Sequence, residues 1–142
     1  MAEETAQSTI YEVIGGRAGV LKLIGRFYEL VAADELLRPV YPEDLGPGEE
    51  KLGLFFEQWL GGPPAYSQKY GHPRLRLRHF PFEIAELHAG RWLRNMRLAM
   101  QDSGWPRELA DAALERLAPL AHHMVNAGQD VPREPLGDVR LD

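Results

Sequence analysis

Apolar residues recur every three or four positions along most of this 142-residue chain, and this spacing limits the fold more than any other feature. The clearest run lies between Ala18 and Ala33, where apolar residues recur at this spacing: Val20, Leu23, Ile24, Phe27, Leu30 and Val31. Such a repeat gives an α-helix one apolar face, because one turn takes 3.6 residues. The alternation typical of a β-strand occurs only in RLRLRH, residues 74–79, which has no second strand to pair with. The sequence therefore predicts an all-α protein.

Glycine pairs end two of the predicted helices in the first half of the chain. A short helical turn, residues 10–14, is capped by Ser8 or Thr9 and stopped by Gly15-Gly16. A long helix covers residues 47–60 and ends at Gly61-Gly62. We interpret both glycine pairs as helix ends and not as phosphate-binding loops.

Prolines mark the expected helix boundaries in the second half of the chain. Residues 61–74, GGPPAYSQKYGHPR, are predicted to be non-helical because glycine and proline are frequent there. Pro81 is expected in the first turn of a helix that runs to about Asp102. Pro106 opens the last helix, which Pro119 is expected to kink.

Composition excludes several classes of protein. The net charge of −5 argues against a sequence-independent nucleic-acid binder. The absence of cysteine excludes disulfides and thiolate metal sites and suits a cytoplasmic location. The polar start does not resemble a secretory signal, and no apolar run reaches the ~20 residues of a membrane helix. The expected organisation is a flexible segment at 1–8, one domain at 9–127 and a flexible tail at 128–142.

One of the five histidines lies among both apolar and positively charged residues. His79 follows Arg74, Arg76 and Arg78 in GHPRLRLRHFPF, residues 71–82. In either a helical or an extended conformation, His79 shares a face with Leu75 while the arginines point elsewhere. His72, His88, His122 and His123 show no such pattern.

Each feature of this segment has an ordinary explanation when taken alone. A single histidine among apolar residues is more often a core residue whose ring bonds to a backbone carbonyl. Arginines more often form a charged face that is exposed to solvent. Together with an all-α chain, however, they favour a haem site. A neutral imidazole is a good axial ligand for haem iron, and arginine binds carboxylates such as the haem propionates. Tyr28, Tyr41 and Trp92, taken singly, are more often core aromatic residues.

The chain resembles the truncated haemoglobins, and specifically their second group. The resemblance extends from Ile10 to Asn126 and is carried by GRFYELVA (25–32), RPVYPEDL (38–45), FFEQWLGG (55–62), YSQKYGHPRLRLRHFPF (66–82) and RWLRNM (91–96). GHPRLRLRH and the tryptophan of RWLRNM are its specific signatures. The resemblance implies a two-over-two helical sandwich around haem b.

The same resemblance implies roles for individual residues. His79 is the expected proximal iron ligand, and Tyr28, Tyr41 and Trp92 form the expected cluster that stabilises the bound ligand. Gly48 occupies the position where many globins keep a distal histidine, which suggests a side entrance for small ligands. The residues expected to contact the cofactor are Leu52, Phe55, Tyr66, His72, Arg74, Arg78, Phe82 and Trp92, with Tyr66, Arg74 and Arg78 as candidates for the propionates.

A haem protein of this kind is expected to bind oxygen, nitric oxide or carbon monoxide at a five-coordinate iron. Several donors around the ligand imply slow oxygen release, which suits ligand chemistry, storage or sensing better than oxygen transport. An enzyme that detoxifies nitric oxide or reduces peroxide with an unidentified reductase is the alternative. A cofactor-free all-α adaptor is a third hypothesis. A homodimer is expected because it is frequent in this group, whereas nucleic-acid binding and stable membrane insertion are not expected.

Overall fold

The computed structural model describes residues 8–72, 74–75, 79 and 81–130. Its helices are α2 (Ile10–Val13), α3 (Gly16–Ala33), the 3₁₀ helix η1 (Arg38–Val40), α4 (Gly46–Trp59), α5 (Ala65–Tyr70), α7 (Glu86–Asp102) and α8 (Arg107–His123). These described residues contain no strand, so the all-α prediction is confirmed.

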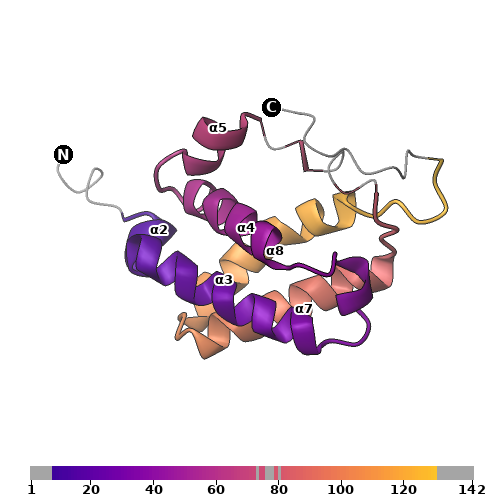
Figure 1. Ribbon diagram of the computed structural model, residues 1–142. Coiled ribbons are helices and arrows are strands. Elements are labelled where there is room, and N and C mark those ends of the chain that lie inside the picture. The colour runs from indigo at the N-terminus through magenta and orange to yellow at the C-terminus, as the bar shows by residue number, and fades with distance from the viewer. Residues whose placement is uncertain (1–7, 73, 76–78, 80, 131–142) are drawn as a thin grey trace.

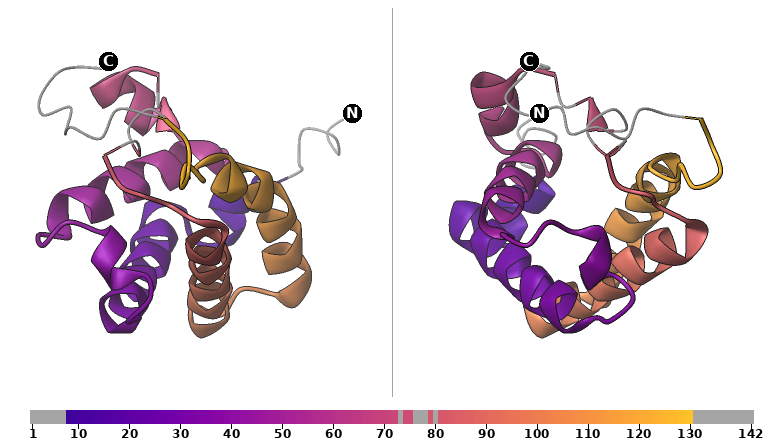
Figure 2. Two further views of the ribbon diagram at one scale, coloured as in Figure 1. Left: turned by 90° about the vertical axis from the view of Figure 1, so that its right-hand side faces the viewer. Right: turned by 45° about the vertical axis from the view of Figure 1, so that its right-hand side comes forward.

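The four long helices form two packed pairs (Figure 1). Helix α3 packs against α4 on one side and α7 on the other, while α7 and α8 form a hairpin. Figure 2 shows the same helices from two further directions. Within the described residues, no helix has both the length and the apolar character needed to cross a bilayer.

The core lies where the four helices meet. Its largest fully buried side chains are Val20, Leu23, Ile24, Phe27, Val31, Phe56, Met96 and Met100. The residues from α3 are those of the predicted apolar face, which explains why this helix contacts both partners. Each such side chain contributes roughly 1.5–3 kcal/mol when it leaves water.

Helix α2 is held against the end of α4 by local and tertiary contacts. Thr9 caps it, since the Thr9 hydroxyl accepts from the Glu12 backbone and the Glu12 carboxylate accepts from Thr9. The Tyr11 backbone N–H donates to the Leu60 carbonyl at 2.9 Å. A Cβ at Gly62 would lie 2.8 Å from the Tyr11 ring, so this second glycine makes room for α2.

Two helix predictions were wrong. Residues 65–70 form α5 although they were expected to be non-helical, because AYSQKY itself contains no glycine or proline. Gly71, with φ of 76°, then ends α5. Helix α7 begins at Glu86 and not at Pro81, since the Ile84 backbone N–H is bound by the distant Asn126 side chain.

Helix α8 continues through Pro119 to His123, so this proline does not end the helix. The predicted kink remains a prediction. The flexible ends expected at 1–8 and 128–142 fall mostly outside the described residues, which include Ser8 and residues 128–130 of these two segments.

Candidate functional site

His79 lies in the loop between α5 and α7 and is half-buried. Its Nδ1 lies 2.6 Å from the Leu75 carbonyl oxygen, one turn earlier in the chain. A carbonyl can only accept, so Nδ1 carries the hydrogen and Nε2 carries the lone pair. Burial lowers the pKa of His79, against a smaller raising effect of the carbonyl bond. The ring is therefore neutral at pH 7 and can act as a ligand through Nε2.

The backbone after His79 is held by one buried side chain, Asn126. The Asn126 amide nitrogen donates to the carbonyl oxygens of His79 (3.3 Å) and Phe82 (3.0 Å). Its amide oxygen accepts from the Ile84 backbone N–H at 3.0 Å. Asn126 itself is 0% exposed. The segment just after α8 thus holds the loop that carries His79.

Three aromatic side chains named from the sequence lie close together in the fold. Tyr28 comes from α3, Tyr41 follows η1, and Trp92 comes from α7. The Tyr28 and Tyr41 rings are 5.9 Å apart and nearly perpendicular, and Phe27 lies 5.1 Å from Trp92 and 5.5 Å from Tyr28. The structure therefore brings together Tyr28, Tyr41 and Trp92.

These groups are all suited to donate hydrogen bonds. Burial raises the pKa of Tyr28, and the nearby Glu49 carboxylate raises it further. Burial also raises the pKa of Tyr41, against a smaller lowering effect of a hydrogen bond from Trp92. Both phenols therefore keep their protons at pH 7. The Trp92 indole N–H and the two phenol O–H groups each supply one donor.

The Tyr28 hydroxyl lies directly over Gly48 on α4. A Cβ built on Gly48 would be 3.1 Å from the Tyr28 hydroxyl oxygen. The side entrance suggested for this position is therefore narrowed by Tyr28.

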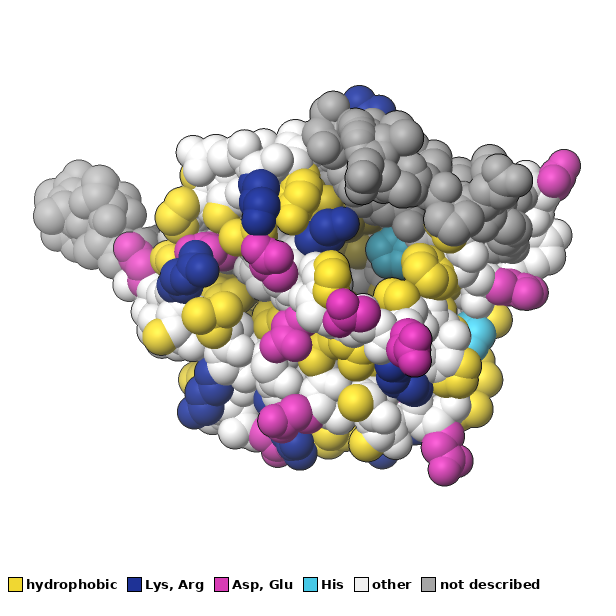
Figure 3. Space-filling model, in the orientation of Figure 1, with side chains coloured by type: hydrophobic (Ala, Val, Ile, Leu, Met, Phe, Trp, Pro, Cys, Tyr) yellow, Lys and Arg dark blue, Asp and Glu magenta, His cyan; other side chains and the backbone are white. Residues whose placement is uncertain are grey.

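The expected cofactor contacts divide into an apolar and a polar set. Among the apolar ones, Leu52, Phe55, Phe82 and Trp92 all remain partly exposed. Phe55 on α4 lies 6.1 Å from Tyr66 on α5, at 90° between the rings, and Tyr66 is buried. Figure 3 shows hydrophobic side chains gathered on this face around a histidine, beside the grey atoms.

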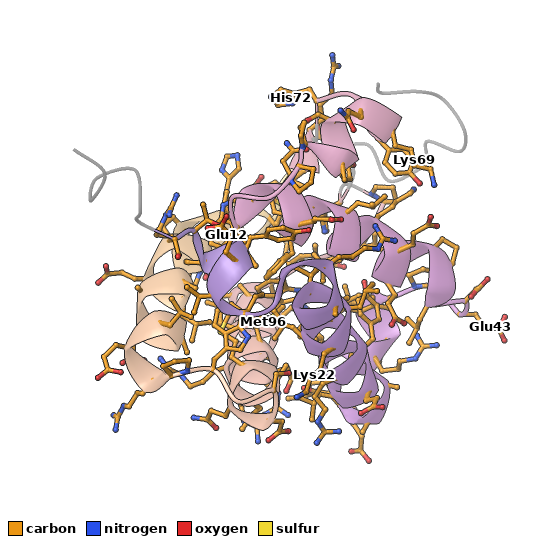
Figure 4. All side chains as sticks on the ribbon, turned by 90° about the vertical axis from the view of Figure 1, so that its left-hand side faces the viewer. Glu12, Lys22, Glu43, Lys69, His72 and Met96 are labelled. Carbon is orange, nitrogen blue, oxygen red and sulfur yellow. The ribbon has the colours of Figure 1, made fainter. Side chains whose placement is uncertain are left out.

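His72 and Arg74 are exposed, just after α5. The Arg74 backbone N–H donates to His72 Nδ1 at 3.2 Å, and Arg74 has φ of 48°. Figure 4 shows His72 beyond the end of α5, far from Met96 in the core. Arg78 lies outside the described residues.

A buried acidic group, Asp34, was not identified from the sequence. One carboxylate oxygen accepts from the backbones of Leu36 (2.9 Å) and Leu37 (3.2 Å). The other accepts from the Asn95 amide at 2.9 Å and from Arg91 Nε at 3.1 Å. Burial alone would raise the pKa of Asp34, but these bonds, led by that of Asn95, lower it to about 2.

The residues present fit haem better than a bare metal ion. Within the described part of the chain, no group of three or more His, Asp or Glu side chains could hold a metal. Haem needs only one or two ligands from the protein, because the porphyrin supplies the others. A neutral His79 with its Nε2 lone pair, and partly exposed aromatic and aliphatic side chains on α4 and α7, meet this need.

Comparison with known proteins agrees with this geometry. The model of the bacterial-like globin family matches residues 9–126. The group 2 truncated haemoglobin YjbI of Bacillus subtilis is 43% identical over 116 residues, which are 82% of this chain and 87% of that protein.

Solved structures show the same fold. The group II truncated haemoglobin of Bacillus anthracis matches with a TM-score of 0.81 at 40% identity, over 94% of this chain and 98% of that one. A truncated haemoglobin of Bacillus subtilis gives 0.78 at 42% identity, over 84% of this chain and all of that one. The predicted two-over-two fold is confirmed by these neighbours. The family implies a haem cofactor and the binding of diatomic gases. This chain belongs to the bacterial-like globins and, among them, to the group II truncated haemoglobins.

Proposed function

We propose that this protein binds oxygen, and also nitric oxide and carbon monoxide, at haem b held by His79, and that it releases oxygen slowly. The observation that supports this proposal is the convergence of Tyr28, Tyr41 and Trp92 from three different elements. Haem, when bound, supplies an iron with one coordination position open to a diatomic ligand.

His79 acts on the proximal side. Its Nδ1–H donates to the Leu75 carbonyl, which orients the ring and makes Nε2 a better donor to a metal. Asn126 holds the following backbone, so the ring orientation does not depend on the loop alone.

Trp92 and Tyr41 act on the ligand side, with Tyr28 in support. We assign the direct hydrogen bonds to the bound ligand to the Trp92 indole N–H and the Tyr41 hydroxyl. Two bonds of about 1 kcal/mol each slow ligand release roughly thirtyfold, since about 1.4 kcal/mol corresponds to a factor of ten. The Bacillus subtilis neighbour is described as oxygen-avid, which supports the same behaviour here.

The propionates of haem need cationic or hydroxyl partners at the edge of the site. Tyr66, Arg74 and Arg78 are proposed for this role, with His72 beside them. The exposure of His72 and Arg74 beyond α5 suits contacts at a solvent edge. Leu52, Phe55 and Phe82 are proposed to contact the apolar part of the porphyrin.

An enzymatic role is the alternative, and the same three donors favour it. Polar donors at the ligand could also assist cleavage of an oxygen–oxygen bond. Nitric oxide oxidation or peroxide reduction would need an external reductase. Multiple-turnover assays with peroxide and with nitric oxide separate this role from ligand binding alone.

The oxygen dissociation rate of the reduced protein tests the proposal. Trp92→Phe and Tyr41→Phe should each raise this rate by about fivefold to tenfold. Trp59→Phe is the matched control, because Trp59 contacts Phe56 and Arg116 and not the three donors. An unchanged rate in both site variants would refute the proposed role of these side chains.

A further inference from the structure

Asp34 joins the end of α3, the turn that follows it and α7. Its side chain, only 3% exposed, receives bonds from the turn after α3 and from two residues of α7. A buried carboxylate that accepts four hydrogen bonds is held firmly in one position. The mechanism proposed above assigns it no role.

The first connection leads from Asp34 to Tyr41. The Asp34 carbonyl accepts from the Arg38 backbone N–H at 2.8 Å. The Arg38 guanidinium then donates to the carbonyls of Tyr41 (3.4 Å), Pro42 (2.9 Å) and Glu43 (2.9 Å). The segment that carries the Tyr41 ring is therefore tied back to the end of α3.

The second connection leads from Asp34 to Trp92. Arg91 and Asn95 are one turn apart on α7, so both lie on the side of this helix that faces Asp34. Trp92 directly follows Arg91. Holding Arg91 and Asn95 to one carboxylate fixes the rotation of α7 about its axis, and with it the direction of the Trp92 indole.

We propose that Asp34 is a positioning residue that sets the separation of Tyr41 and Trp92, and so determines whether both can donate to the same bound ligand. The proposal rests on the ligand-side roles of Tyr41 and Trp92 given above. Asp34 touches neither ring; its carboxylate acts through the Leu36 and Leu37 backbones of the turn on one side and through Arg91 and Asn95 on the other.

Asp34→Asn is the main test variant, since it keeps the size of the side chain. Its amide NH₂ would face the donors of Arg91 and Asn95, so the bonds to α7 are lost while those to the turn can remain. Asp102→Asn is the matched control, because Asp102 also joins α3 to α7, through Arg26 at 2.8 Å, but on the exposed surface.

Two readouts on the haem-loaded protein distinguish positioning from a purely structural role. In the carbon monoxide complex, the frequency of the C–O stretching band depends on the hydrogen-bond donors near the ligand. Stopped-flow measurements give the oxygen dissociation rate. In Asp34→Asn we expect the band to move toward that of Trp92→Phe and oxygen release to accelerate about fivefold to thirtyfold, the loss of one to two hydrogen bonds. The Asp102→Asn protein should match the wild type in both.

The swapped variant Asp34→Asn/Asn95→Asp restores a bond between positions 34 and 95 in the opposite direction, and should return both readouts toward wild type. If Asp34→Asn does not fold, Arg91→Met removes one bond and should shift the band in the same direction. A folded Asp34→Asn or Arg91→Met protein with a wild-type band and rate overturns the positioning role. If Trp92→Phe also leaves the band unchanged, the proposed function fails as well.

Discussion

Gly48 and Gly53 lie on the same helix, α4, but only Gly48 lies under a hydroxyl group. A Cβ at Gly48 would meet the Tyr28 hydroxyl at 3.1 Å, whereas a Cβ at Gly53 meets nothing within 4 Å. Alanine substitutions at both positions change the helix propensity of α4, but only the one at Gly48 should also affect the site.

Gly48→Ala should displace the Tyr28 hydroxyl by a few tenths of an ångström. If Tyr28 supports Tyr41, oxygen release should change by a factor of up to about five, equivalent to about 1 kcal/mol. Gly53→Ala should leave the oxygen dissociation rate unchanged and raise the free energy of unfolding by up to about 1 kcal/mol. Equal oxygen dissociation rates in the two variants would argue against a supporting role of Tyr28.

At the scale of elements, Asn126, which lies just after α8, holds the loop that follows His79. Asn126→Ala removes the side-chain hydrogen bonds to His79, Phe82 and Ile84 from a buried site. We expect the free energy of unfolding, measured by urea titration of the cofactor-free protein, to fall by about 2–4 kcal/mol.

Asn126→Asp is the informative partner variant. It keeps the acceptor for Ile84 but loses both donors to the His79 and Phe82 carbonyls. It should lose haem to an acceptor protein faster than the wild type does. Wild-type haem retention in Asn126→Asp would show that the loop is held by other contacts.

Asp34 gives the contact between α3 and α7 a defined pH dependence. Its pKa is lowered from 3.8 to about 2, so the folded state binds its proton more weakly than the unfolded state. The stabilisation is complete above about pH 4 and is lost as the pH falls through about 2, and it amounts to roughly 2 kcal/mol. Urea unfolding of wild type and Asp34→Asn should therefore differ at pH 7 and converge near pH 2. A difference that persists undiminished to pH 2 would contradict this assignment.

The long helices were predictable because their apolar faces repeat within a single element. Helix α5 was not, since the glycines and prolines around residues 65–70 dominated the local pattern. The start of α7 was not either, because Asn126 binds Ile84 across 42 positions of sequence.

The candidate site follows the same rule. His79 stood out through its neighbours, whereas Asp34, Asn95 and Asn126 become buried only when helices distant in sequence pack together. A lone aspartate after a helix is ordinarily a surface residue. Asp34 is followed by Leu36 and Leu37, and Arg91 and Asn95 lie one turn apart on a later helix. This pattern is the sequence signal that could have pointed to the cluster.

At the scale of the whole molecule, two helix pairs leave one face with partly exposed aromatic side chains. Haem that occupies this face binds the folded chain only, so it should stabilise the protein by mass action. We expect a higher Tm for the haem-loaded protein than for the cofactor-free protein, by differential scanning calorimetry. Equal Tm values would place haem outside the packed structure. The homodimer stays a prediction, which sedimentation velocity can test.

The central claim is that His79 is the one protein ligand of the haem iron. Titration of haem into the cofactor-free protein, followed by its Soret band, tests this claim most directly. The wild type should bind one haem per chain, while His79→Gly should give a weakened and shifted band that added imidazole restores. A His79→Gly protein with the wild-type spectrum and no response to imidazole would contradict the account.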